Sequence, residues 1–136
     1  IQLSGDESVD HCRQIDLPVI KTLHVRPDTT PDALRRQMEA FQPHVSAFLL
    51  DTAKAGLRGG TGQAFDWNVA AELSASFNLF VAGGLHAGNV REVIQRVHPF
   101  GIDLSSGVEF APGIKDFDKL ADLFETLDGI NASSST

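Results

Sequence analysis

Short apolar runs alternate with amphipathic segments along the whole chain. The runs that predict strands occupy residues 1–3, 17–25, 45–51, 79–82 and 101–104. Apolar residues at helical spacing, several of them behind capping residues, predict helices over residues 8–14, 29–41, 66–73, 89–97 and 117–127. Apolar strands that alternate with helices are typical of a parallel sheet covered by helices. The pattern therefore predicts an α/β fold of about five β-α units.

Three of the expected helices carry a clear apolar face. In the second helix, Leu34, Met38 and Phe41 fall at positions i, i+4 and i+7 of one stripe. The faces of the last two helices comprise Val90, Val93, Ile94 and Val97, and Leu120, Leu123, Phe124 and Leu127. We expect all of these side chains to point into the core.

The number of β-α units limits which architectures are possible. A complete (β/α)8 barrel takes about 200 residues at its most compact, or roughly 25 residues per unit. The 136 residues of this chain are therefore too few for a complete barrel. A section of a barrel and a complete open sheet with helices on both faces both fit. A flavodoxin-like or receiver-like domain has a similar length and is the alternative.

Composition limits the possible classes of function. The formal net charge of −7 argues against a nucleic-acid partner, since phosphate binding needs clustered Lys and Arg. No apolar run approaches the ~18 residues of a membrane span, and no secretory leader is visible. The single cysteine, Cys12, excludes an internal disulfide and is expected to be an inert core thiol. Five histidines without i, i+4 spacing predict no metal site, and we expect a cytoplasmic protein that contacts neither nucleic acid nor membrane.

The ends of the strands carry the candidate chemistry, because both architectures place their sites at the carboxyl ends of the strands. Asp51 ends the third apolar run. A carboxylate at this point is partly withdrawn from water, which favours its protonated form and makes Asp51 a candidate general acid. The alternative is that Asp51 caps the following loop or pairs with Lys54 or Arg58.

Small residues follow the last two strands: Gly83 and Gly84 in one loop, and Ser105, Ser106 and Gly107 in the other. Small residues let backbone N–H groups approach an anion, and the N-terminus of a following helix adds a favourable dipole. The two loops are therefore candidate phosphate-binding loops. The alternative is a pair of tight turns, which need glycine anyway.

A glycine-rich segment over residues 52–63 includes Arg58, Gly59 and Gly60. It lacks the Lys-Ser/Thr ending of a nucleotide-binding loop and the spacing of a dinucleotide-binding motif. We interpret it as a candidate lid that closes over substrate and excludes water. The alternative is a flexible loop without a function of its own.

A series of motifs runs through nearly the whole chain. It comprises Gln-Leu-Ser-Gly-Asp-Glu at residues 2–7, Phe-Leu-Leu-Asp-Thr at 48–52, Gly-Gly-Thr-Gly at 59–62, Phe-Asp-Trp at 65–67, Ala-Gly-Gly-Leu at 82–85, Asn-Val at 89–90, Gly-Ile-Asp-Leu-Ser-Ser-Gly-Val-Glu at 101–109 and Pro-Gly-Ile-Lys-Asp at 112–116. In this order the motifs resemble the phosphoribosylanthranilate isomerase family. The resemblance implies that residues 1–128 form the C-terminal section of a (β/α)8 TIM barrel, about strands 4 to 8. Residues 129–136 remain as a polar tail that we expect to be disordered.

The resemblance also implies an activity in tryptophan biosynthesis that needs no cofactor and acts on a small phosphorylated substrate. N-(5-phosphoribosyl)anthranilate is converted by an Amadori rearrangement to 1-(2-carboxyphenylamino)-1-deoxyribulose 5-phosphate. A general acid opens the ribose ring to a Schiff base, and a general base then removes the C2 proton. By match to the family motifs, Asp51 is the acid and Asp103 lies near the ribose, while the phosphate loops contain Gly83, Gly84, Ser105, Ser106 and Gly107.

Several features of the family's active site are missing from the chain. The family's general base is a cysteine in a Lys-x-Cys-Gly motif on the first strand, and Cys12 follows a later motif, so it cannot take that role. The arginine expected to bind the anthranilate carboxylate is absent as well, and Ser4 stands where the family usually has His. We therefore expect the chain to pair with an N-terminal barrel section carrying strands 1 to 3, or to self-associate through its open sheet edges.

Other functions remain as alternatives. The first is a non-catalytic fragment that binds a phosphorylated sugar and lacks the general base. Indole-glycerol-phosphate synthase and the histidine-pathway isomerase resemble the chain in its last two loops, but the Leu-Leu-Asp-Thr and Gly-Gly-Thr-Gly motifs argue against them. A receiver-like domain is the weakest alternative, because its acidic cluster after the first strand is missing. A Lys-x-Cys-Gly strand upstream would favour the enzyme over the binding fragment.

Overall fold

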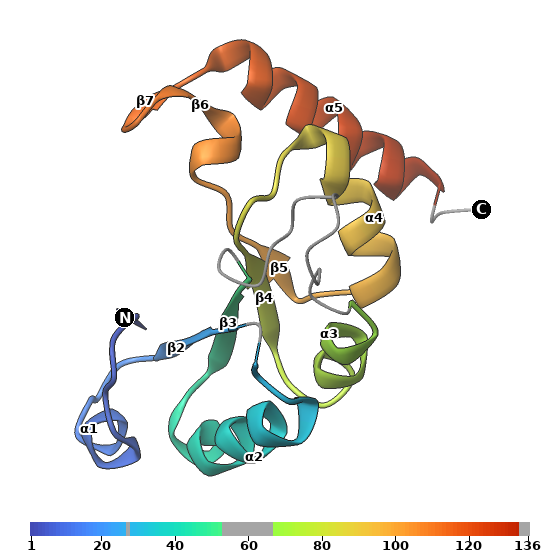
Figure 1. The fold of residues 1–136 in the computed structure, drawn as a ribbon. Helices are drawn as coiled ribbons and strands as arrows, with labels where there is room; N and C mark the ends of the chain where they lie inside the picture. Colours follow the sequence, from blue (N-terminus) through green and yellow to red (C-terminus); the bar gives the residue numbers. More distant parts are fainter. Residues whose placement is uncertain (27, 53–66, 134–136) are drawn as a thin grey trace.

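The computed structural model describes residues 1–26, 28–52 and 67–133. Its main sheet has five parallel strands in the order β1-β2-β3-β4-β5, so each strand pairs with its neighbour along the chain (Figure 1). The strands are β1 (Gln2–Leu3), β2 (Ile20–His24), β3 (Ala47–Asp51), β4 (Leu79–Ala82) and β5 (Gly101–Ile102). Among the described residues, β1 and β5 pair on one side only. The predicted α/β fold with five parallel strands is confirmed.

The helices of the main repeat follow the strands in the predicted order. They are α1 (Val9–Arg13), α2 (Pro31–Phe41), α3 (Trp67–Ser74), α4 (Ala87–Val97) and α5 (Phe117–Ser133), and a 3-10 turn, η1 (Gln42–His44), extends α2. Ser8 and Thr30 cap the first two helices, because their side-chain oxygens accept hydrogen bonds from the N–H groups of His11 and Ala33. These caps satisfy N–H groups that a helix start leaves unpaired, so the two helices begin where the sequence predicts.

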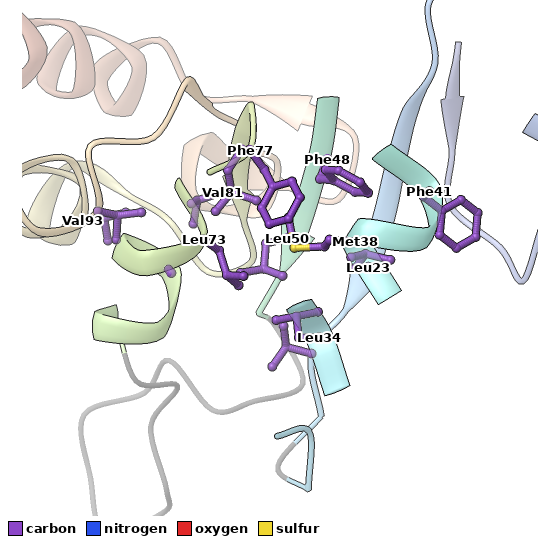
Figure 2. Close-up of a cluster of buried hydrophobic side chains, with 14 of the residues drawn as sticks. Leu23, Leu34, Met38, Phe41, Phe48, Leu50, Leu73, Phe77, Val81 and Val93 are labelled. Atoms are coloured by element: carbon purple, nitrogen blue, oxygen red, sulfur yellow. The ribbon is translucent and has the colours of Figure 1, made fainter. Parts of the chain in front are cut away.

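The core lies between one face of the sheet and helices α2, α3 and α4 (Figure 2). Leu23 and Leu50 contribute from β2 and β3, and Met38 and Leu73 pack against them from α2 and α3. The strands contribute alternate residues to this face, as a period of two requires. The other face of the same strands carries Thr22, His24, Leu49 and Asp51, and the site described below lies there.

The segment after β5 contains an element that the sequence did not predict. A 3-10 turn, η3 (Ser106–Val108), leads into an antiparallel hairpin of β6 (Glu109–Ala111) and β7 (Ile114–Lys115), and α5 follows. Gly113 sits in the turn of the hairpin with a φ of 80°, in the left-handed region that glycine adopts without strain. Strands this short show no alternating pattern, which is why the sequence did not reveal the hairpin.

Helix α5 departs from the prediction in two respects. Residues 129–133 are helical, so the prediction of a disordered tail from residue 129 is wrong for them. Ile130 is only 6% exposed and supplies an apolar anchor one turn beyond Leu127. Phe124, expected in the core, is 60% exposed. Its neighbour Leu123, also expected in the core, is buried there; the two differ because a helix turns consecutive residues to different sides.

An ion pair fixes the start of the chain to the sheet. The Lys21 ammonium, on β2, is buried and donates to Oε2 of Glu7 at 2.8 Å and to the main-chain oxygen of Gly5 at 2.6 Å. It also lies 5.9 Å from the ring centre of Phe41, within range of a cation–π contact. The hydrogen bond from Lys21 is the main cause that holds the pKa of Glu7 below its ordinary value.

We expect this pair to make stability dependent on acid pH. A carboxyl group whose pKa is lowered by folding adds stability above its ordinary pKa of about 4.3, and that contribution is lost as the pH falls through the lowered value. The free energy of unfolding should therefore be greater for the parent chain than for Glu7→Gln at pH 7. The difference should vanish in acid, as denaturant titrations at several pH values would measure. A difference that does not change with pH would contradict a role for the Glu7 charge.

Candidate functional site

A cleft of 370 Å³ opens on the sheet face opposite the helices, at the carboxyl ends of the strands. The structure brings every predicted site residue in its described part to this one cleft, namely Asp51, Gly83, Gly84, Asp103, Ser105, Ser106 and Gly107. Asp51 is the last residue of β3, and the others lie in the segments that follow β4 and β5. The predicted lid residues Arg58, Gly59 and Gly60, and the alternative partner Lys54, lie outside the described residues.

Asp51 and His24 form the polar centre of the cleft. They are the last residues of neighbouring strands β3 and β2 and stand directly opposite each other in the register. Nδ1 of His24 lies 3.1 Å from Oδ2 of Asp51, and Nε2 lies 2.9 Å from the main-chain oxygen of Ser4. The sequence singled out Asp51 alone. The signal that could have identified His24 is its place at the end of the preceding strand.

Hydrogen bonds on both sides hold this pair in position. The Thr52 side chain is fully buried, and its hydroxyl donates to the main-chain oxygen of Ala82 at 3.0 Å, which ties the chain after Asp51 to β4. On the other side, the hydroxyl groups of Ser4 and Thr22 lie 3.2 Å apart. The Asp51 side chain keeps 26% of its surface exposed. It is thus anchored but still open to the cleft.

The loop after β4 turns sharply into α4. Gly83 and Gly84 have φ values of 97° and 69°, a region that side chains disfavour. The amide of Asn89 donates to the main-chain oxygen of Gly84 at 3.0 Å, and its oxygen accepts from the N–H group of His86 at 2.9 Å. His86 in turn caps the helix, which therefore begins at Ala87 rather than at the predicted Asn89.

Gly107 brings the last two loops into direct contact. A Cβ atom at this position would lie only 1.8 Å from the main-chain oxygen of Leu85, far inside van der Waals distance. Leu85 follows Gly84 in the loop after β4, and it is buried. The two glycine-containing loops can lie against each other only because residue 107 has no side chain.

The unpredicted hairpin supports the second of these loops. Lys115, on β7, donates to the main-chain oxygen of Ser105 at 3.2 Å and pairs with Glu109 at 3.0 Å. The Ser105 hydroxyl donates to Glu109 at 3.3 Å. The hydrogen bond from Lys115 is the main cause that holds the pKa of Glu109 below its ordinary value. The hairpin therefore fixes the backbone of the loop while Ser106 and Gly107 face the cleft.

A larger cavity of 550 Å³ lies between residues 5–7 and α2. Its buried charged group, Lys21, is already engaged by Glu7 and by the main-chain oxygen of Gly5. We place the site in the smaller cleft, because the strand ends, Asp51 and both glycine-containing loops converge there.

Cys12 lies away from the cleft. It lies on α1 and is 1% exposed, in the core, and burial raises the pKa of its thiol. Since the thiolate is the reactive form, we expect native Cys12 to react with iodoacetamide far more slowly at neutral pH than the same chain unfolded in urea. Mass spectrometry after timed labelling would measure this. Equal rates in the two states would show that the thiol is accessible.

Two further features of the described residues concern other kinds of site. In this part of the chain, three or more His, Cys, Asp or Glu side chains do not gather where they could hold a metal ion. The described helices also include none that is both long and apolar enough to cross a membrane.

Comparison with known proteins relates the chain that forms this cleft to one family. The family model described as N-(5'phosphoribosyl)anthranilate (PRA) isomerase matches residues 1–126. A Nitrosospira multiformis protein named N-(5'-phosphoribosyl)anthranilate isomerase is 46% identical over 121 residues, which are 89% of this chain and 56% of that protein. The chain thus spans little more than half the length of this curated relative.

Solved structures agree with the sequence comparison. Phosphoribosyl anthranilate isomerase from Thermotoga maritima matches with a TM-score of 0.75 at 35% identity, over 94% of this chain and 60% of that one. A second isomerase structure, in complex with reduced 1-(o-carboxyphenylamino)-1-deoxyribulose 5-phosphate, matches with a TM-score of 0.73 at 32% identity, over 94% and 58% of the two chains. The five-stranded sheet therefore has the same fold as the corresponding part of these proteins.

Proposed function

Since the chain belongs to the N-(5'-phosphoribosyl)anthranilate isomerase family, we propose that it forms the C-terminal section, strands 4 to 8, of a cytoplasmic (β/α)8 isomerase of tryptophan biosynthesis. The reaction is the Amadori rearrangement of N-(5-phosphoribosyl)anthranilate to 1-(2-carboxyphenylamino)-1-deoxyribulose 5-phosphate, without metal or cofactor. One observation carries the proposal: Asp51 and the two glycine-containing loops line a single cleft at the ends of the strands.

Each of these groups has a chemical role in the proposed reaction. Asp51 is the general acid that protonates the ribose ring oxygen and so opens the ring to a Schiff base. The loops around Gly83, Gly84, Ser106 and Gly107 hold the phosphate, because their backbone can approach its oxygens without obstruction. Asp103, also in the cleft, lies near the ribose.

The general base comes from a partner in this proposal. Within the described residues, the cleft is lined by no cysteine, and Cys12 lies in the core. The partner is a barrel section with strands 1 to 3, and it pairs with the edges of β1 and β5 that no described strand covers. Edge strands present rows of N–H and C=O groups that another strand can satisfy. Without that section, the same edges allow the chain to self-associate.

Complementation of a tryptophan auxotroph that lacks the isomerase tests the proposal. We would express the chain alone and also fused behind strands 1 to 3 of a family relative that carries the Lys-x-Cys-Gly motif. Growth with the fusion only, and its loss with Asp51→Asn, is the expected result. Growth with the chain alone would overturn the proposal that the base comes from elsewhere. A soluble fusion that does not support growth would overturn the isomerase assignment.

A non-catalytic fragment that binds a phosphorylated sugar is the second candidate. The observation that favours it is that the described lining of the cleft includes both glycine-containing loops and no cysteine. Calorimetric titration with ribose 5-phosphate separates the two functions. Binding to a fusion that has no isomerase activity would favour the binding fragment.

A further inference from the structure

The two hydrogen bonds of His24 determine where its protons lie. Nε2 lies 2.9 Å from the main-chain oxygen of Ser4, and Nδ1 lies 3.1 Å from Oδ2 of Asp51. A carbonyl oxygen can only accept a hydrogen bond, so Nε2 carries a hydrogen and donates it. In the neutral ring Nδ1 is therefore the nitrogen without a proton, and it is the one that faces Asp51.

The contact between His24 and Asp51 requires one further proton. When this proton lies on Oδ2, the carboxyl group donates to Nδ1; when it lies on Nδ1, the imidazolium ring donates to the carboxylate. Without it, two acceptor atoms would face each other at 3.1 Å, which is repulsive. The two side chains therefore hold one mobile proton between them.

The fold keeps this arrangement in place and accessible. His24 and Asp51 are paired across β2 and β3, and the Ser4 and Thr22 hydroxyl groups, 3.2 Å apart, hold the residue that receives the Nε2 bond. The side chains of His24 and Asp51 are 37% and 26% exposed. Water can thus reach the pair and relay a proton back to it after Asp51 has given one away.

We propose that His24 reloads Asp51 with the proton that this carboxyl group donates to the substrate, an inference that rests on the proposed function. In the acid step the O–H bond of Asp51 breaks and an O–H bond forms on the ribose ring oxygen. The C1–O bond of the ring breaks, and the nitrogen lone pair of the substrate forms the C1=N bond. Asp51 is then a carboxylate opposite an unprotonated Nδ1. Water relays to Nδ1 of His24 the proton that the general base has removed from C2, and His24 passes it to Oδ2, which restores the acid without leaving a hydroxide ion.

His24 is a positioning residue in this scheme, because it acts on the substrate only through Asp51. Its replacement should therefore slow turnover and leave substrate binding intact. In the fused enzyme described above, His24→Gln is expected to lower kcat by about 10- to 100-fold, since glutamine cannot carry the mobile proton. KM should stay within about twofold of the parent value. His11→Gln, on an exposed position of α1 outside the cleft, is the matched control and should change neither constant.

A spectroscopic measurement tests the same inference without a variant. Nitrogen NMR of the labelled parent should find the neutral His24 ring with its proton on Nε2, and the Nδ1 signal should change in Asp51→Asn. A neutral ring with its proton on Nδ1 would overturn the inference, and so would a kcat for His24→Gln equal to that of the parent. If circular dichroism shows that His24→Gln does not fold, the tautomer measured in the parent decides whether the inference holds. A fused parent without any isomerase activity would instead overturn the proposed function, and the reloading role with it.

Discussion

Asp51→Asn is expected to lower kcat of the fused isomerase by about 10²- to 10⁴-fold, the range that general acid–base catalysis contributes in enzymes. Asparagine has nearly the same size, and its amide can still donate to Nδ1 of His24, but it has no proton to give to the ribose ring oxygen. KM should change little, because the phosphate loops are intact. The side chain is partly exposed at a strand end, so the melting temperature should change little as well. Steady-state kinetics and a thermal melt measure both effects.

Asp10→Asn is the control for the loss of a carboxylate. Asp10 lies on α1, its side chain is 78% exposed, and it pairs with Arg13 on the surface. Exposed pairs of this kind contribute at most about 1 kcal/mol, so kcat and stability should both be retained. An Asp51→Asn enzyme with the kcat of the parent would show that another group protonates the substrate. A rise in KM alone would assign Asp51 to binding instead.

Gly107→Ala is expected to damage both stability and phosphate binding. The new Cβ atom would lie 1.8 Å from the main-chain oxygen of Leu85, and a backbone atom cannot move aside as a flexible side chain can. The loops after β4 and β5 must then separate. Overpacking costs about 1–3 kcal/mol and sometimes more, and a displacement of about 1 Å in a site can cost about 10²-fold in rate. Thermal melts and calorimetric titration of ribose 5-phosphate would measure the two effects.

Gly129→Ala separates this effect from a general intolerance of the chain to alanine. Gly129 lies within α5, and the nearest atom to a new Cβ is Nη2 of Arg91 at 3.0 Å, the far end of a flexible side chain. Alanine favours a helix over glycine by about 1 kcal/mol, so this variant should match the parent or exceed its stability. Equal ligand affinity in Gly107→Ala and the parent would show that the contact between the two loops does not shape the phosphate site.

Local signals explain most of what the sequence predicted about the fold. Ser8 and Thr30 mark helix starts because their oxygens can accept from N–H groups that no earlier turn satisfies. The end of α5 was harder to predict, because Gly129 and the serines that follow favour an end. The burial of Ile130 depends on tertiary packing, in which α5 lies against α4 and η3, and no local pattern records that.

At the cleft, too, local signals could be predicted from the sequence and contacts between distant segments could not. The Asp51 position and the glycine-containing loops could be predicted from strand ends, which are visible in the sequence. The contact between His24 and Asp51 could not, because it depends on the register of β2 against β3, and parallel strands far apart in sequence can pair in several registers. Ser4 shows a further limit. Its place in a motif indicated a departure from the family, but only the structure shows that its main-chain oxygen receives the His24 ring.

The strand order β1-β2-β3-β4-β5 has a consequence for how the chain folds during its synthesis on the ribosome. Each new strand can add to an edge that is already finished when it emerges, so no strand described here has to wait for a partner that is synthesised later. Contacts between neighbouring units close short stretches of chain, and short closures favour rapid folding. Asp51 would be held by β2 long before Gly107 leaves the exit tunnel. The carboxyl group that we propose as the general acid is therefore in place first, and the loop that we propose as part of the phosphate site is completed last.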